Sequence, residues 1–248
     1  MGTLWALTAR ELKAFWYSPV AYVVGALFLF AQGGVFWLLV MVLNDARSDP
    51  SWTISQAFFG GTFFYWISLL LIPPALTMRT FSEEKRTGTI ELLLTAPVSD
   101  AQVVVAKFLG AWLAFSALWM VTLAFFIGLR CLTPFDWAPI LMGYLGTALL
   151  GAAFVSVGIL ASSLTRNQVI SAVLAFVVCL CVFSIGILDA FAHNPEASRA
   201  LQYLSLFEHV RDFSRGILDT RPLVLYLSLT VICLFFTGRV IGSPRWRS

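Results

Sequence analysis

Long apolar runs, separated by short polar segments, make up most of the chain. A helix needs roughly 20 apolar residues, at 1.5 Å each, to cross a hydrocarbon core of about 30 Å. Six runs are long enough, and we expect spans at about 20–43, 57–78, 105–129, 139–164, 168–188 and 222–241. The pattern therefore predicts an all-α polytopic membrane protein that forms one transmembrane domain over residues 1–248, with both termini on the same side.

The segment before the first run has an amphipathic pattern. At about residues 3–17, apolar side chains such as Trp5 and Phe15 share one helical face, and Arg10 and Lys13 lie opposite. This arrangement is typical of a helix that lies in the membrane interface. Pro19 is expected to separate this helix from the first span, because proline disfavours a continuous straight helix.

A polar segment at residues 80–102, TFSEEKRTGTIELLLTAPVSDAQ, separates the second and third runs. Residues 82–86 are expected to extend the second span beyond the membrane, until Gly88 breaks the helix. Thr89 can cap a new short helix at about 89–96 that carries a leucine run. We therefore expect a short helix across the cytoplasmic ends of two spans.

Two further signals bound that short helix. Pro97 ends it, and Ser99 with Gln102 has the form of a capping box that opens the third span. Because a connection between two helices often needs only about 2 to 8 residues, the long segment can be read either as an ordered loop or as a contact surface. Its exposed apolar run favours the contact surface.

The connection between the fifth and sixth spans is also too long for a simple turn. Asn194–Pro195 reads as the start of one short helix, and Ser205 with Glu208 has the form of a capping box that starts another. Gly216 offers a stop. We expect two short helices at about 195–216 on the outer mouth of the protein.

The positive charges predict the orientation of the spans, since Lys and Arg are enriched in cytoplasmic segments. Six of the sixteen basic residues fall on one side: Arg47, Arg130, Arg199, Arg211, Arg215 and Arg221. The remaining ten fall on the other: Arg10, Lys13, Arg79, Lys85, Arg86, Lys107, Arg166, Arg239, Arg245 and Arg247. Both termini and the segment at 80–102 are therefore expected in the cytoplasm.

Composition supports a membrane protein and excludes several other classes. The chain is 59% hydrophobic and 12% charged, with a mean hydropathy of +0.86, which leaves too little polar surface for a water-soluble protein. The net charge of +3 is too small to indicate a nucleic-acid partner. The four cysteines lack the paired spacing of a zinc site, so we expect small core residues and neither a metal site nor a disulfide framework.

The residue types present give little support for catalysis or for ion-coupled transport. Glu208, His209 and Asp212 could form an acid site or part of a metal site, since Glu208 and Asp212 share a helix face. With only two histidines and no H-E-x-x-H motif, a solvated helix face is the simpler interpretation. Secondary transporters usually place ionisable groups inside the membrane, whereas the six runs hold none away from their ends.

The segment FSEEKRTGTIELLLTAPVSDAQVVVAKFLGAW resembles the signature of ABC-2-type permeases, the membrane subunits of short six-helix ATP-binding-cassette exporters. Their pattern E-x-x-x-G-T-x-E-x-L-L-x-x-P is met here by Glu84, Gly88, Thr89, Glu91, Leu93, Leu94 and Pro97. The segment LSLFEHVRDFSRGILDTRPLVLYLSL is similar to gliding-motility-type (GldF-like) and NosY-like permeases. The resemblance implies a type V exporter-like fold with an N-terminal elbow helix, a cytoplasmic coupling helix and two outer helices.

The resemblance also implies a place in a larger complex. Two permeases, identical or different, would sit in the inner cell membrane, among its lipids, on two copies of an ABC ATP-binding subunit. The surface facing each ATPase would include Glu83, Glu84, Arg86, Thr89, Ile90, Glu91, Leu93, Leu94 and Pro97. An outer gate would include Phe207, Glu208, His209, Asp212 and Phe213.

The chain itself is not expected to hydrolyse ATP. A phosphate-binding loop needs a lysine directly after glycine, and the lysines present, Lys13, Lys85 and Lys107, do not follow one. ATP and magnesium are therefore expected only in the partner ATPase, with no cofactor and no catalytic residue in this chain. We expect a permease that couples ATP hydrolysis to export or conformational work. The alternatives are a mechanotransmitting complex that moves no substrate, then a secondary transporter, then a membrane enzyme, and the substrate stays open.

Overall fold

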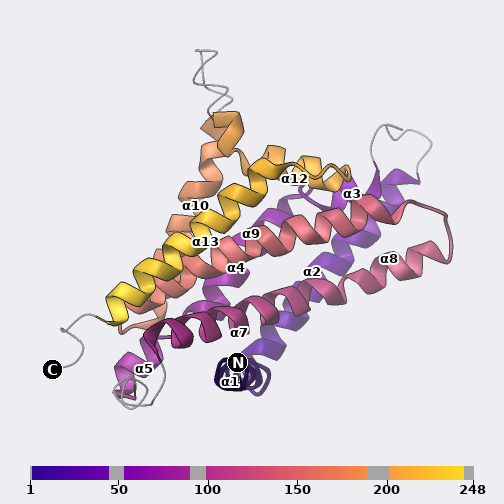
Figure 1. Cartoon of the computed structure of the whole chain (residues 1–248). Helices are drawn as coiled ribbons and strands as arrows, with labels where there is room; N and C mark the ends of the chain where they lie inside the picture. The colour runs from indigo at the N-terminus through magenta and orange to yellow at the C-terminus, as the bar shows by residue number, and fades with distance from the viewer. Residues whose placement is uncertain (1, 45–52, 90–98, 189–200, 243–248) are drawn as a thin grey trace.

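The computed structural model describes residues 2–44, 53–89, 99–188 and 201–242, and within these ranges every regular element is a helix (Figure 1). The helices are α1 (Gly2–Trp16), α2 (Pro19–Leu43), α3 (Ile54–Phe58), α4 (Phe63–Thr77), α5 (Ser82–Thr87), α7 (Asp100–Val121), α8 (Leu123–Arg130), α9 (Trp137–Leu164), α10 (Gln168–Leu188), α12 (Leu206–Ser214) and α13 (Thr220–Ile241). The short helix expected at about 89–96 and most of the first outer helix lie outside the described residues.

Within the described residues, five segments are helical, long and apolar enough to cross a membrane. They are Ala21–Leu43, Asp100–Arg130, Trp137–Leu164, Gln168–Leu188 and Thr220–Ile241. These segments correspond to five of the six expected spans. The chain is therefore an all-helical, multi-pass membrane protein.

The expected span at 57–78 is wrong as a single helix. The chain forms α3, turns at Gly60 and Gly61, and begins α4 at Phe63 after the Thr62 side chain caps it. Gly60 has a left-handed φ of 86°, a conformation that favours glycine. The 15 residues of α4 extend only about 22 Å at 1.5 Å per residue, which is less than a hydrocarbon core.

The helix of the third span begins at the predicted capping box, five residues before the apolar run expected at 105–129, and it is interrupted at Thr122. The capping box of Ser99 and Gln102 is confirmed, and it starts α7 at Asp100. At Thr122 the helix gives way to α8, and the Thr122 hydroxyl lies 2.6 Å from the Trp119 carbonyl oxygen. With this start, Lys107 lies two turns inside α7.

Helix α9 is the central helix of the bundle, and α4, α7, α10, α12 and α13 pack around it (Figure 1). Two of its glycines allow neighbours to approach closely. A Cβ atom at Gly151 would lie 2.0 Å from Cε1 of Phe115, and one at Gly158 would lie 2.0 Å from Oγ1 of Thr77. Small residues of this kind bring membrane helices into direct contact.

The bundle has two polar ends. Helices α1 and α5 lie at one end, together with the last turn of α13, and α3 and α12 lie at the opposite end (Figure 1). Pro19 begins α2 after Ser18, as predicted, and α1 turns away to lie along α7. The two ends of the described chain therefore lie on the same side.

Candidate functional site

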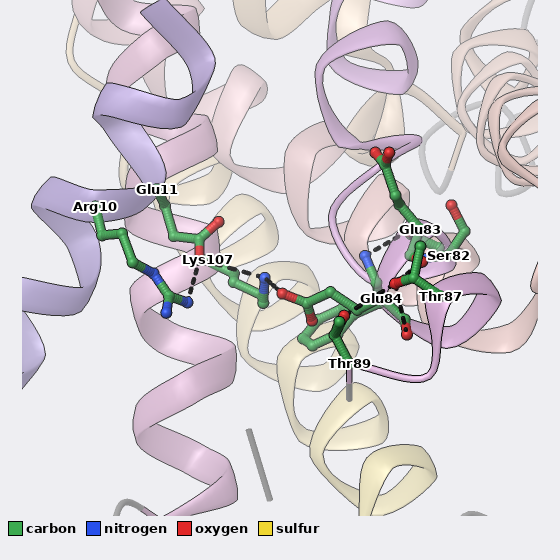
Figure 2. A network of polar contacts seen from close by, with 10 residues as sticks. Arg10, Glu11, Ser82, Glu83, Glu84, Thr87, Thr89 and Lys107 are labelled. Atoms are coloured by element: carbon green, nitrogen blue, oxygen red, sulfur yellow. Dashed lines mark hydrogen bonds and ion pairs between the residues drawn. The ribbon is translucent and has the colours of Figure 1, made fainter. Parts of the chain in front are cut away.

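Three helices meet around the ammonium group of Lys107 at the α1 end of the bundle. Lys107 Nζ lies 2.7 Å from Glu84 Oε1 on α5 and 3.3 Å from Glu11 Oε1 on α1. Figure 2 shows Lys107 between the two carboxylates, with Arg10 on the outer side of Glu11. The Lys107 side chain is only 3% exposed, so these carboxylates replace the water it loses. We call Glu11, Glu84 and Lys107 the ion-pair junction.

Helix α1 packs closely against α7 at this junction because α7 has a glycine, Gly110, at the point of contact. A Cβ atom at Gly110 would lie 2.8 Å from Cβ of Glu11, so a larger residue would push α1 away. Gly110 lies three residues after Lys107, on the same side of α7. The same face of α7 therefore supplies both the cation and the space for the carboxylate.

Helix α5 is separate from α4, which corrects the expectation that residues 82–86 continue the second span. The backbone N–H groups of Phe81 and Ser82 donate to Ser162 Oγ on α9, at 3.0 and 3.1 Å. These two bonds turn the chain after α4 and start a new helix. Gly88 ends α5 with a left-handed φ of 74°, as predicted.

A second lysine attaches α5 to the end of α9. Lys85 is buried, and its Nζ donates to the carbonyl oxygen of Ser163. Burial, and to a smaller extent the nearby positive charge of Arg166, lowers the Lys85 pKa to about 8. Helix α5 is thus held by α9 on one side and by the ion-pair junction on the other.

The predicted ATPase-facing residues that the structure describes differ in their exposure and contacts. Glu84 points inward to Lys107, Glu83 is half-buried, and Arg86 and Thr89 are exposed. Thr89 lies 3.0 Å, hydroxyl to hydroxyl, from Thr87. The other predicted residues of this surface lie outside the described residues: Ile90, Glu91, Leu93, Leu94 and Pro97.

At the opposite end, the aromatic residues of α12 pack against the bundle. Phe207 packs against Trp66 of α4 and Phe183 of α10, with ring centroids 4.6 and 4.9 Å away. Phe213 is buried against α9, where a Cβ atom at Gly146 would lie 2.7 Å from its ring. Both predicted gate aromatics therefore hold α12 on the helices that span the bundle.

The polar residues of α12 depart from the sequence prediction. The Ser205 side chain makes no capping bond, and Glu208 pairs with Arg211 one turn along the helix instead. Gly216 follows the helix with a left-handed φ of 82°, as predicted. Asp212 is half-buried beside this pair.

His209 is buried and makes two polar contacts, so it is not part of an exposed helix face. Its Nε2 lies 3.1 Å from the Tyr203 carbonyl oxygen, and its Nδ1 lies 3.2 Å from the Tyr226 hydroxyl. This geometry suits a neutral ring that donates through Nε2 and accepts through Nδ1. Burial is the main cause of a lowered His209 pKa, which the Tyr203 bond and the charge of Asp212 partly oppose. In the described part of the chain, no three His, Cys, Asp or Glu residues are placed to hold a metal ion.

A model of the family described as ABC-2 family transporter protein matches residues 5–237. The chain belongs to this family. The match runs from α1 to the last turns of α13, so it covers both the ion-pair junction and α12. No curated protein matches the sequence. The ABC-2 resemblance of the segment after α4 is thereby confirmed at the level of the family.

Membership explains why this ABC-2 protein has an all-helical fold of apolar spans, since the family is the membrane permease component of ABC transporters and lacks an ATPase domain. Sequence reasoning missed two members of the junction, Glu11 and Lys107. One signal was present: a lysine within a membrane helix usually faces a partner in the protein interior. The identity of that partner required the fold, because Glu11 is 96 residues away in the sequence.

Proposed function

We propose that this ABC-2 protein is the membrane-spanning subunit of an exporter that is driven by two copies of a separate ATP-binding subunit. The observation that supports the proposal best is the anchoring of α5. This helix directly precedes the segment at 90–98, and buried polar contacts connect it to α1, α7 and α9. A force applied to that segment reaches α5 at one end and α7 at the other, and the contacts of α5 and Lys107 connect both helices to α9 and α1.

The segment at 89–97 would act as the coupling helix of the resemblance, with Leu93 and Leu94 in the ATPase groove. Glu83, Arg86 and Thr89 would lie at its rim, while Glu84 would transmit the movement through Lys107. ATP and magnesium would bind in the partner, and α1 would be the elbow helix. This end would face the cytoplasm, which agrees with the excess of Lys and Arg assigned to it.

The complex would contain two permeases, identical or different, in the inner membrane, and the gliding-motility-type subgroup is the proposed relative. Helix α12 would form part of the outer gate through Phe207, Glu208, His209, Asp212 and Phe213. The Trp66 and Phe183 contacts of Phe207 connect this gate to α4 and α10. Movement of α4 or α10 would therefore displace α12.

A mechanotransmitting complex that moves no substrate is a second candidate, and one observation favours it. Helix α9 carries Ser162 and Ser163, which hold α5, in its last turn, and Gly146, which packs on Phe213, in its first half. One continuous helix of 28 residues thus joins the two polar ends. Such a rod can carry a movement across the membrane without opening a pathway.

The docking assignment can be tested by purifying the native complex through a tag on this chain. The Leu93→Asp variant should lose the ATP-binding subunit, because an unpaired carboxylate in an apolar groove costs roughly 2 kcal/mol or more. Leu132→Asp is the matched control, since Leu132 is exposed and directly follows α8, which extends away from α5 in Figure 1. Retention of the ATP-binding subunit by Leu93→Asp at the level of wild type and the control would overturn the assignment.

A further inference from the structure

A cavity of about 330 Å³ lies beside the ion-pair junction, between α1, the start of α2, the end of α4, α5 and α7. This volume is at the lower end of the range of small-molecule sites, about 300–1,000 Å³. The lining combines apolar and charged side chains, so the cavity suits an amphiphile better than a uniformly polar solute. The outer gate lies at the opposite end, whereas Glu83 and Glu84, which line this cavity, also belong to the proposed ATPase-facing surface.

The apolar part of the lining faces the beginning of the first span. It consists of Phe15, Ala21, Val24, Leu76 and Ala111 together with neighbouring alanines. Tyr22 and Val23, in the same turns of α2, are exposed. A hydrocarbon chain that lies along the outside of α2 can therefore bring its polar head to this cavity.

The charged part combines three carboxylates, on Glu11, Glu83 and Glu84, with two cations, on Arg79 and Lys107. Lys107 already forms ion pairs with Glu11 and Glu84. Glu84 Oε2 is buried and has no hydrogen-bond partner among the described residues. Buried polar atoms are nearly always hydrogen-bonded in native proteins, so this oxygen indicates a missing donor.

Two other groups of the lining are available to a ligand. Neither the Glu83 carboxylate nor the Arg79 guanidinium makes an ion pair with a described residue, and Arg79 is exposed at the mouth of the turn after α4. Figure 2 shows both residues on α5, with the Glu84 carboxylate directed to Lys107 and the Glu83 carboxylate in a different direction. The cavity thus offers acceptors on one helix and a cation on the neighbouring turn.

We propose that this cavity binds a membrane phospholipid whose headgroup carries a primary amine. The ammonium group has three N–H donors and would bind Glu84 Oε2 and Glu83, and the phosphate would bind Arg79. The acyl chains would lie along α2. A quaternary amine has no N–H to donate, and an anionic headgroup would meet three carboxylates against two cations.

Lipid retention by the purified full-length chain tests the proposal, measured by native mass spectrometry. The probes are phosphatidylethanolamine, phosphatidylcholine and phosphatidylglycerol with identical acyl chains, and soluble O-phosphoethanolamine. Phosphatidylethanolamine should bind about tenfold more tightly than phosphatidylcholine, the order expected for one charge-assisted hydrogen bond. Equal binding of these lipids, preference for phosphatidylglycerol, or equally tight binding of the soluble headgroup would overturn the proposal.

Variants separate recognition of the amine from general stability. Glu84→Gln and Glu83→Gln should each reduce the preference for the primary amine, while Glu208→Gln at the opposite end should leave it unchanged. Arg10→Gln breaks a neighbouring ion pair outside the cavity lining, so it should retain the preference. Loss of the preference in Arg10→Gln as well as Glu84→Gln would assign the effect to structure alone and refute the site.

Discussion

Lys107→Met is the substitution that should disturb the α1 end of the bundle most. Methionine keeps the length and packing of the side chain but removes the charge that Glu11 and Glu84 share. Glu84 then loses its partner on Oε1, and Oε2 has none among the described residues. The variant therefore leaves a carboxylate in a partly buried position without compensation.

The size of the effect follows from the burial of the pair. Breaking a buried ion pair by removal of one partner costs about 3–5 kcal/mol. The two carboxylates are 21% and 23% exposed, so the lower value, about 3 kcal/mol, applies here. A chain of this size loses roughly 2–4 °C in Tm per kcal/mol, which gives a decrease on the order of 6–12 °C.

Thermal unfolding of the detergent-solubilised chain measures this decrease. Arg10→Gln is the matched control, because Arg10 also pairs with Glu11 but is 57% exposed, and exposed pairs contribute only about 0–1 kcal/mol. In the double variant with Glu84→Gln, part of the loss should be recovered, as expected for residues in contact. A Lys107→Met decrease in Tm no larger than that of Arg10→Gln would show that the ion-pair junction does not stabilise this end of the bundle.

The remaining predictions concern pH and packing. Because burial lowers the Lys85 pKa to about 8, the unfolded chain binds more protons above that pH, so the unfolding free energy should rise by about 3 kcal/mol from pH 8 to 10.5. Denaturant titrations of Lys85→Met should lack this rise. The lowered His209 pKa acts in the same direction on the acid side, since its contribution is complete above about pH 6.5 and is lost below it. Thermal scans at pH 7.5 and 5.5 should show that His209→Gln loses less Tm on acidification than wild type. Gly151→Ala should cost about 1–3 kcal/mol because its methyl group meets Phe115, whereas Gly128→Ala, with open space around it, should not destabilise. Equal Tm values for the two glycine variants would contradict the packing of α7 on α9.

Local signals in the sequence predicted the described helix ends well. Pro19 before the first span, the capping box of Ser99 and Gln102, and the glycine stops at Gly88 and Gly216 all act through neighbouring backbone groups. Such signals need no knowledge of the fold. For the same reason, five apolar runs correspond to long helices.

The break before α4 could not be read from hydrophobicity. Phe58, Phe59 and the glycines that follow look like part of one apolar run, yet a Cβ atom at Gly60 would lie 2.8 Å from Val210 of α12. The turn therefore depends on a helix 150 residues later in the chain. The run of aromatic residues predicts burial but does not distinguish a straight span from a bent one.

The polar site illustrates the same limit. Glu84 lies in a recognisable motif and its partner Lys107 is only 23 residues away, but their pairing needs the turn that Ser162 creates. Ser205 and Glu208 failed as a capping box because Glu208 has a competing partner in Arg211. The residue types predicted which segments carry charged side chains. Long-range packing determined which of these side chains form ion pairs.

In the proposed complex, the segment after α5 receives force from an ATP-binding partner at the α1 end of the bundle. Photo-crosslinking in native membranes tests it most directly, with a photoreactive residue at position 93 and, as control, at position 212 on α12. Position 93 should yield an adduct with a subunit that contains a nucleotide-binding loop, and position 212 should not. An ATP-binding subunit captured from position 212 and not from position 93 would contradict it.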